Sequence, residues 1–444
     1  MKKSHWALAC FAVATCAWSP ATPQDADLAP VPREAEEANL TLLLREALGA
    51  SPALRAAEAR LEASRHLPSQ AEAPPDPEVS LAYLNDGYSS FTLGDTEFSN
   101  LALTWTQEVL YPGKREGSAL VAQAGIEIAG RELERLRLEV GAAVKSGYAD
   151  LYRLDRTTAL LEETQSVLES LAQAARTRYE VGEGIQENVL KAMTEIVRLE
   201  AEQVKVAQDR VAAEARLNAV LGRSAGAPIG AALRLPEGSL PDSVDNLAEA
   251  AAGAAPEILA LEAAVRGAQA MEERARLDLK PDFIWSASYQ YRGDFDPMLM
   301  GMFGLRLPIY RDRKQAAALL QAGSEVIAAR HSLQDLQVRT RASVRELVAR
   351  AERAARLMVL YEQGIIPQAG GALDSAQASY GVGRIAFIDL LNDLTILLEA
   401  RIELAAQESD RLQALAALEP LVSRELVIVP GATGGQGGSV EYHE

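Results

Sequence analysis

The feature that most constrains the fold of this chain is a stretch that occurs twice. Residues Ala175–Leu190 read ARTRYEVGEGIQENVL, and residues Ala376–Leu391 read AQASYGVGRIAFIDLL. Each copy has Tyr-x-Val-Gly and, six residues after the Gly, an Asn or Asp followed by two aliphatic residues. Each copy lies between two long stretches of helical pattern, and glycine adopts positive φ at little cost. We therefore expect both stretches to be the tips of helical hairpins.

The helices beside the first tip are predicted to be long and paired. No proline occurs from Lys114 to Tyr179, which corresponds to a helix of about 100 Å. After the tip, apolar residues follow 4-3 spacing that only Gln203 and Arg210 interrupt: Ile185, Val189, Ala192, Ile196, Leu199, Val206, Ala213, Leu217 and Val220. Such a heptad seam must pack against another helix over its whole length.

Four other segments have the two-residue period of β-strands. Apolar and aromatic residues alternate with small or polar ones at Val79–Tyr83, Leu101–Trp105, Phe283–Tyr291 and Leu299–Leu307. Period two predicts strands with one apolar-aromatic face and one Ser/Thr/Gln face. We expect the last two strands to be joined by a turn at 293–297.

The order of these segments repeats, which indicates an internal duplication in a mainly α chain with a small β part. We place the first repeat (helix, two strands, long hairpin) at 39–223, an equatorial connector at 224–245, the second repeat at 246–420 and a C-terminal tail at 421–444. Within the repeats, Pro68 is expected to end the first helix and the last helix to end near Leu418.

The N-terminus has the pattern of an exported protein. Lys2 and Lys3 precede a short apolar stretch, which predicts a signal peptide at 1–17, and a Pro- and Ala-rich linker follows at 18–38. Both cysteines, Cys10 and Cys16, lie in this leader, so the mature chain is expected to have no cysteine metal site or disulfide. Val13–Cys16 is close to a lipobox. Two interpretations of this segment remain. Either Cys16 is lipidated, or cleavage near Ala17 or Ala21 removes the cysteine.

Charge and missing motifs exclude several functions. The formal net charge is −18, which argues against nucleic-acid binding. There is no Walker loop, nucleophile elbow, HExxH or Rossmann glycine pattern, so we expect neither an enzyme nor a cofactor. No later segment has an apolar run of membrane-spanning length. Any membrane crossing must then use strands, which implies a bacterial outer membrane.

Four strands cannot close a barrel, and open edges are not tolerated in lipid. Four strands from each of three chains would give twelve, an even number in the known range. We therefore expect a homotrimer in which a 12-stranded transmembrane β-barrel continues into a hollow α-helical barrel.

At this point the chain resembles the TolC family of outer-membrane efflux channels. Besides the duplication and the tips, the resemblance rests on Leu217–Arg223 (Leu-Asn-x-x-Leu-Gly-Arg) and on Gln107–Lys114 (QEVLYPGK). The Pro-Gly-Lys segment looks most like the heavy-metal (CzcC/CusC-like) branch of RND systems. The resemblance implies a trimeric conduit in outer-membrane lipid that docks on a periplasmic adaptor and an inner-membrane pump, usually of the RND class, and exports metal cations or drugs. The alternative is a non-conducting, periplasm-spanning coiled-coil or adhesin-like trimer.

The resemblance also implies roles at the tips. Asp389 would line the periplasmic aperture together with Asn392, which replaces a second acid of the family; the other interpretation of Asp389 is a solvated acid near a turn. Tyr380, Glu187 and Asn188 match positions that link neighbouring hairpins, although Tyr380 is equally consistent with ordinary packing. The candidate adaptor-docking residues are the exposed tips themselves: Val181, Gly182, Val382, Gly383 and Arg384.

A last candidate site lies on the fourth predicted strand. Met298, Met300 and Met302 share one face, opposite the leucines. If that face is luminal, their thioethers could contact soft metals such as Cu(I). The other interpretation is that they are incidental residues near a loop.

Overall fold

The structure is a computed structural model that describes residues 38–87, 90–240 and 243–429. The predicted signal peptide, residues 18–37 of the linker, Cys16 and the tail from residue 430 lie outside these ranges. Among the described residues, none of the helices combines the length and the apolar character that a membrane span requires.

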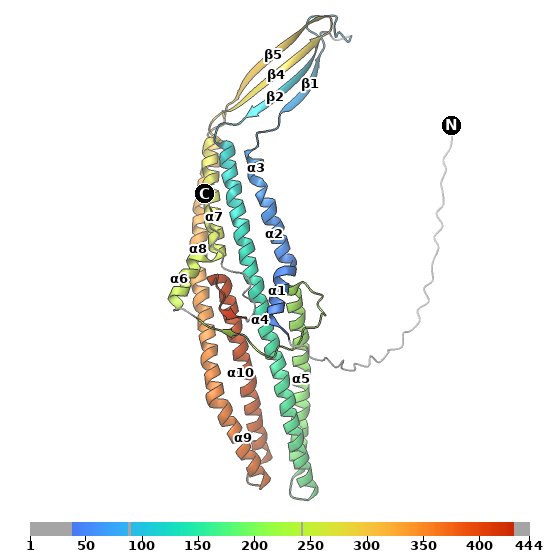
Figure 1. The fold of residues 1–444 in the computed structure, drawn as a ribbon, viewed down its shortest axis with the longest axis vertical. Coiled ribbons are helices and arrows are strands. Elements are labelled where there is room, and N and C mark those ends of the chain that lie inside the picture. Colours follow the sequence, from blue (N-terminus) through green and yellow to red (C-terminus); the bar gives the residue numbers. More distant parts are fainter. Residues whose placement is uncertain (1–37, 88–89, 241–242, 430–444) are drawn as a thin grey trace, which may run out of the picture. The chain divides into compact units, whose positions relative to one another are not determined.

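The first half contains three short helices, two strands and a long hairpin (Figure 1). The long helix α4 is continuous over 67 residues, as the absence of proline predicts. In chain order the elements are α1 (Leu40–Ala50), α2 (Pro52–Arg65), α3 (Leu67–Glu72), β1 (Glu78–Leu84), β2 (Asn100–Val109), α4 (Lys114–Glu180) and α5 (Gln186–Leu221).

The second half repeats this order after a connector that contains a two-residue strand. From the connector onward, the elements are β3 (Glu237–Gly238), α6 (Val244–Ala254), α7 (Pro256–Leu277), β4 (Asp282–Arg292), β5 (Phe295–Arg306), α8 (Gln315–Leu360), a π-helix (Tyr361–Ile365), α9 (Ile366–Gly381), α10 (Phe387–Val422) and β6 (Val427–Ile428). Thus α6 and α7 correspond to α1 and α2, and α8 with α9 corresponds to α4.

Helix α4 is the element on which the helical part is assembled. It packs against α5, α7 and α10, while α8 packs against α6, α7 and α10. The heptad residues of α5 that face α4 are buried or partly buried, as predicted. The two interruptions of the seam are matched by polar partners: Gln203 Nε2 donates to Gln165 Oε1 (2.8 Å) and Arg210 Nε donates to Asp155 Oδ1 (2.5 Å).

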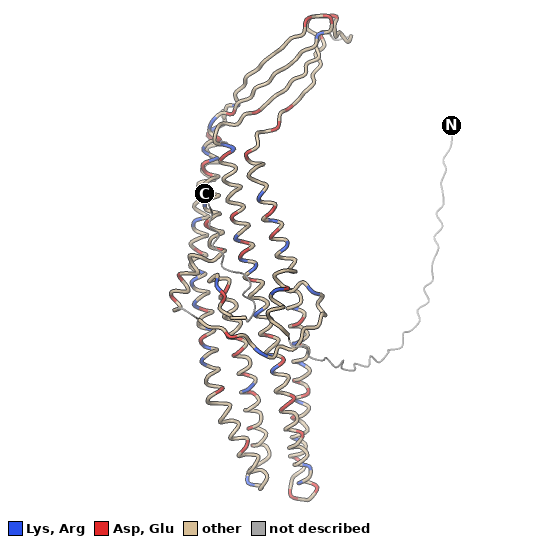
Figure 2. The backbone as a smooth tube through the Cα atoms, viewed as in Figure 1, with Lys and Arg blue, Asp and Glu red and all other residues tan. Residues whose placement is uncertain are grey.

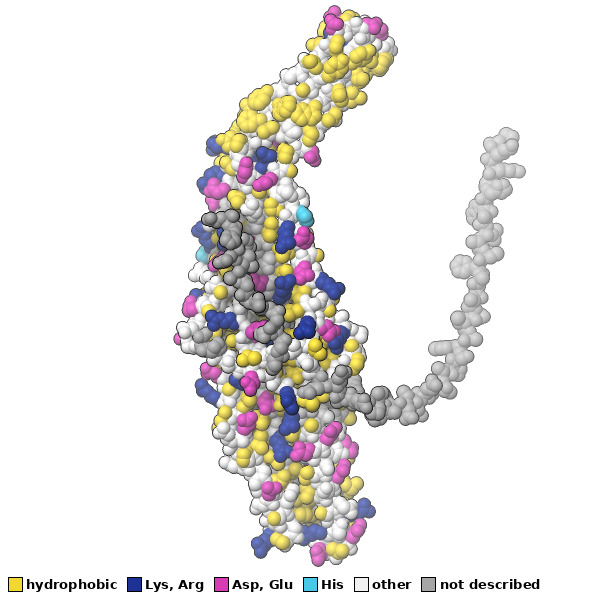
Figure 3. Space-filling view, viewed as in Figure 1, with side chains coloured by type: hydrophobic (Ala, Val, Ile, Leu, Met, Phe, Trp, Pro, Cys, Tyr) yellow, Lys and Arg dark blue, Asp and Glu magenta, His cyan; other side chains and the backbone are white. Residues whose placement is uncertain are grey.

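The four predicted strands form one antiparallel sheet in the order β1-β2-β4-β5. Its register places Leu81, Leu103, Tyr289 and Leu299 in one row of the apolar face. The other face carries Ser80, Thr104, Ser288 and Met300 in the adjacent row. Hydrophobic side chains gather over the strands in Figure 3, and charged residues are rare along the strands in Figure 2.

Two prolines act differently from our expectation, Pro68 and Pro297. Pro68 does not end a helix but lies in the first turn of α3, where its missing N–H costs nothing. By contrast, the chain stays helical through Pro367, which lies in the first turn of α9 directly after the π-helix. Pro297 lies inside β5 rather than in a turn, and the free edge of β5 tolerates it because no neighbouring strand of this chain needs its N–H.

The segment around residue 420 also differs from the expected boundary. Helix α10 continues through Pro420 to Val422, and β6 then pairs with β3 of the connector. A buried ion pair between Glu419 and Lys145 holds the end of α10 in place. Glu419 accepts hydrogen bonds from Lys145 Nζ (2.8 and 2.6 Å to its two oxygens) and from the backbone N–H groups of Leu426 and Val427 (both 2.9 Å).

Candidate functional site: the two hairpin tips and the sheet–helix joint

Both hairpin tips have the same backbone. At the first, the N–H of Gly182 bonds to the carbonyl of Tyr179 (3.0 Å) and the N–H of Glu183 to that of Arg178 (2.9 Å). At the second, Gly383 bonds to Tyr380 (3.0 Å) and Arg384 to Ser379 (2.9 Å). These pairs define a Schellman motif, which requires positive φ at its glycine. The observed values are 79° and 72°, so the glycines end the helices as predicted.

Arg178 connects the two tips within one chain. Its Nη1 donates to the backbone carbonyl of Tyr380 (2.6 Å), and its Cζ lies 5.1 Å from the centroid of the Tyr380 ring. The guanidinium is therefore held at the C-terminal ends of α4 and α9, where both helix dipoles favour a cation. On its other side, the Tyr380 ring packs against Phe387 at 5.3 Å between centroids, and only 9% of Tyr380 is exposed.

The resemblance suggested a link between Tyr380 and Asn188. Within one protomer, the described contact of Tyr380 with the first hairpin is to Arg178 instead. Glu187, next to Asn188, forms an ion pair with Lys191 of its own helix (2.7 Å), and both side chains are solvated. Within one chain the Tyr380 ring packs against Arg178 and Phe387, and a link from Tyr380 to a neighbouring hairpin stays a prediction.

The proposed aperture residues lie on the exposed side of α10. Asp389 occupies the first turn, where its N–H bonds to Ala386 (3.2 Å), and Asn392 follows one turn later. A carboxylate near a helix N-terminus interacts favourably with the helix dipole. Both side chains are exposed in the single chain. Their position fits a site that faces either solvent or an axis shared with other chains.

The docking candidates include one exposed valine at each tip. Val181 is 65% exposed and Val382 is 69% exposed, and the two occupy the same position in their Schellman motifs. Exposed valines at hairpin ends are an apolar surface that a partner could cover. Arg384 is also exposed.

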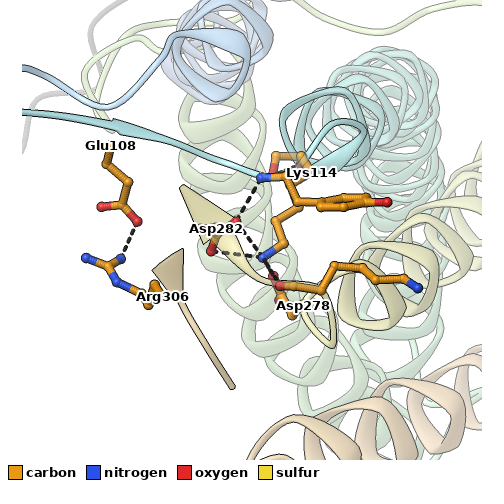
Figure 4. A network of polar contacts seen from close by, with 8 residues as sticks. Glu108, Lys114, Asp278, Asp282 and Arg306 are labelled. Atoms are coloured by element: carbon orange, nitrogen blue, oxygen red, sulfur yellow. Dashed lines mark hydrogen bonds and ion pairs between the residues drawn. The ribbon is translucent and has the colours of Figure 1, made fainter. Parts of the chain in front are cut away.

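The QEVLYPGK motif forms a joint between the sheet and the helices (Figure 4). Lys114, of which 3% is exposed, places Nζ at 2.9 and 3.0 Å from the two carboxylate oxygens of Asp282 and at 3.4 Å from Asp278. The backbone N–H of Tyr111 donates to the same Asp282 (2.8 Å). Glu108 forms an ion pair with Arg306 nearby. The joint ties the turn from β2 to α4 to the turn from α7 to β4, and so ties the two halves together.

The Leu-Asn-x-x-Leu-Gly-Arg motif ends α5, and two of its side chains, Asn218 and Arg223, bind other segments of the chain. Gly222 adopts φ of 75°, and Asn218 Nδ2 donates to the carbonyls of Ala225 (3.3 Å) and Ala227 (2.7 Å). Arg223 Nε donates to Glu46 Oε1 of α1 (2.6 Å). This hydrogen bond lowers the pKa of Glu46 below its ordinary value.

Sequence reasoning missed Arg178, Asp282 and Glu419. Arg178 immediately precedes the first Tyr-x-Val-Gly motif, and a basic residue in the last turn of a helix was a usable signal. Asp282 follows Pro281 at the start of a predicted strand, but nothing in the sequence points to Lys114 as its partner.

Comparisons with known proteins agree with this fold. Residues 43–223 match the model of the family described as outer membrane efflux protein. The chain is 28% identical over 279 residues to the outer membrane efflux protein BepC of Brucella suis biovar 1 (strain 1330); the match covers 60% of this chain and 59% of that relative's length.

Solved structures show the same fold at lower identity. The outer membrane protein VceC of Vibrio cholerae superposes with a TM-score of 0.73 at 21% identity, over 86% of this chain and 96% of VceC. CusC superposes with a TM-score of 0.69 at 15% identity, over 92% of this chain and 99% of CusC. CusC is no more similar than VceC, so the heavy-metal branch stays a prediction.

Duplicated helical hairpins below a small antiparallel sheet are the fold of TolC-like outer-membrane channels, which are channels rather than enzymes. The chain is similar to the outer membrane efflux protein family over residues 43–223, and to the relative BepC over 279 residues. It lies in the outer membrane, with its helical part in the periplasm.

Proposed function

We propose that the protein is the channel component of an efflux system, working as a homotrimer that leads from a periplasmic adaptor and an inner-membrane pump of the RND class to the outside. The transported compounds are metal cations or drugs. The observation that carries this proposal is the open sheet. Both β1 and β5 have an unpaired edge in one chain, and the sheet separates an apolar-aromatic face from a polar face. Open edges in lipid must be paired, and copies of the same chain can pair them.

The duplication supports a definite way of pairing. In the first half, Val79 of β1 lies opposite Trp105 of β2. In the second half, Trp285 of β4 lies opposite Phe303 of β5. We therefore take β1 and β4, and likewise β2 and β5, as corresponding strands of the two repeats. The inner strands of one chain pair Trp105 with Ala287. The equivalent pair is Phe303 of one chain with Leu81 of the next.

An equivalence between the halves also holds at the ionic joint, one residue offset from that of the strands (Trp105 to Phe303 is 303 − 105 = 198 positions, Lys114 to Arg313 is 313 − 114 = 199). The N–H of Arg313 bonds to the carbonyl of Tyr310 (3.1 Å) as that of Lys114 bonds to Tyr111 (3.1 Å), and the Pro75-Asp76 pair precedes β1 as Pro281-Asp282 precedes β4. In the trimer, Arg313 would therefore take the place of Lys114 and meet Asp76 of the adjacent chain. Both residues are exposed in one chain.

The helices offer a second surface for the adjacent chain. Helix α5 carries exposed apolar side chains that recur every seven residues on the side away from α4: Leu190, Val197, Val204 and Val211. A heptad stripe of this kind requires a partner helix. Closing a ring of hairpins would cover the stripe and bring the tips, with Asp389 and Asn392, toward a common axis. The exposed tips, with Val181 and Val382, would then face the adaptor.

Conductance of the purified protein in planar bilayers tests the proposal. We expect discrete, long-lived current steps from the trimeric species. A trimer that inserts into the bilayer but carries no current would overturn the channel and support a non-conducting structural protein. Loss of the trimer band under native conditions would overturn the assembly.

A further inference from the structure

Three of the seven methionines of the chain lie within five residues of β5. Met298, Met300 and Met302 alternate with Leu299 and Gly301, so all three side chains project from one face of the strand. They are 46%, 48% and 56% exposed. No other part of the sheet carries methionine.

The register identifies which face this is. Met298 lies opposite Gln290, Met300 opposite Ser288, and Met302 opposite Ser286. Farther along these rows are Ala102, Thr104 and Thr106 of β2. Thr104 Oγ1 donates to Ser288 Oγ (3.0 Å), which confirms that these small polar side chains share one surface.

The methionines are thus the bulky members of a neutral, hydroxyl-rich face. The opposite face of β5 takes its apolar bulk from Leu299, Phe303 and Leu305 instead. The three methionines do not fill a packed core, because about half of each side chain is exposed to solvent. What distinguishes methionine from leucine at such positions is its sulfur, a soft and uncharged ligand atom.

Strand geometry allows the three sulfurs to converge. Alternate residues of a strand are about 6.8 Å apart, and each methionine has three rotatable side-chain bonds. The central Met300 can therefore share an ion with either neighbour. Among the described residues, His, Cys, Asp and Glu form no group that could hold a metal ion.

We propose that Met298, Met300 and Met302 form a binding site for soft monovalent cations, Cu(I) or Ag(I). Thioethers favour Cu(I), whereas Zn(II) prefers imidazole and thiolate and Mg(II) prefers oxygen. The site deepens the proposed function, since on the polar face of a channel it would select a class of transported cation. Binding itself does not depend on conduction.

The test is Cu(I) binding to the full purified protein in detergent, by competition with a chromophoric Cu(I) chelator under anaerobic conditions. We expect about one Cu(I) per chain, and loss of this Cu(I) in the variant M298L/M300L/M302L, which keeps volume and apolarity. The matched control is M193L/M271L, which removes two exposed methionines outside the sheet and should bind as the unaltered protein does.

Two further measurements exclude trivial results. The single variant M300L, which removes the central ligand, should weaken binding while leaving the trimer and its unfolding temperature unchanged. Zn(II) should not compete. Equal Cu(I) binding by the triple variant and the unaltered protein, or competition by Zn(II), would overturn the site. Conductance of the same preparations tests the channel separately.

Discussion

Arg178 of α4 donates a hydrogen bond from Nη1 to the backbone carbonyl of Tyr380, 2.6 Å away, and so joins the ends of the two hairpins. The contact crosses 202 residues of sequence and adds a cation–π interaction with the tyrosine ring. It is the kind of contact that fixes one hairpin tip against the other.

The first prediction concerns this link. In R178A we expect the contact between the tips to weaken by about 2 kcal/mol, because a charged hydrogen bond and a cation–π interaction are lost. The hairpin ends should then separate more often, and single-channel conductance should rise. R176A is the matched control, since the ion pair that Arg176 forms among the described residues is with Glu180 of its own helix (3.1 Å). Identical currents from R178A and R176A would contradict the role of Arg178.

The second prediction concerns the aperture. If Asp389 faces the common axis, D389N should lower the preference of the channel for cations, because three negative charges are removed from one ring. The shift in reversal potential across a salt gradient measures this preference. D374N removes an exposed carboxylate from the neighbouring helix α9 and should leave the potential unchanged. A reversal potential that does not move in D389N would exclude the aperture role.

The third prediction concerns the joint between sheet and helices. K114M removes a buried cation and leaves Asp282 without its charged partner, which we expect to destabilise the protein by about 3–5 kcal/mol. Thermal unfolding followed by circular dichroism measures the loss. K314M, which changes an exposed lysine at the start of α8, is the control. Equal unfolding temperatures for the two variants would show that the pair contributes nothing to stability.

The fourth prediction concerns the register between chains. In L81C/F303C, oxidation should give covalent dimers and trimers, because directly opposite residues of antiparallel strands have Cβ atoms about 5 Å apart. S80C/F303C is the control, since neighbouring residues of a strand project from opposite faces. If the control cross-links and the test pair does not, the register is shifted by one residue.

The fifth prediction concerns acid stability. The hydrogen bond from Arg223 depresses the pKa of Glu46, so the stabilisation is complete above the unfolded-state pKa of about 4.3 and is lost as pH falls through the lower folded-state pKa. Between pH 7 and pH 3, the unfolding temperature of E46Q should therefore fall less than that of the unaltered protein. E62Q, at an exposed position of α2, should follow the unaltered protein. A parallel pH profile for E46Q would refute the linkage.

The regular parts of this fold were predictable because their physical causes are local. Tyr-x-Val-Gly encodes a Schellman turn whatever surrounds it, and a heptad with two polar interruptions predicts a paired helix. Even the interruptions agree with the structure, since Gln203 and Arg210 meet Gln165 and Asp155. Period-two alternation likewise predicted the four strands and which side of each is apolar.

The contacts that were missed depend on residues far apart in the sequence. Lys114 and Asp282, Lys145 and Glu419, and Arg178 and Tyr380 are 168, 274 and 202 residues apart. No periodicity pairs such residues, and each looks alone like an ordinary surface charge or aromatic residue. Pro68 was misjudged for a related reason, because a proline that ends one helix and a proline that begins the next look the same in a sequence.

The small sheet of β3 and β6 has a consequence for how the chain can be rearranged. Strand β3 immediately precedes the second half and β6 immediately follows it, and the two lie side by side. The second half therefore leaves and rejoins the rest of the molecule at one place. Segments whose two ends lie close together tolerate circular permutation and domain insertion. The β3–β6 pair is therefore the place at which an exchange of the second half needs no new path of the chain, provided that the new α7 and α10 still match α4 of the first half.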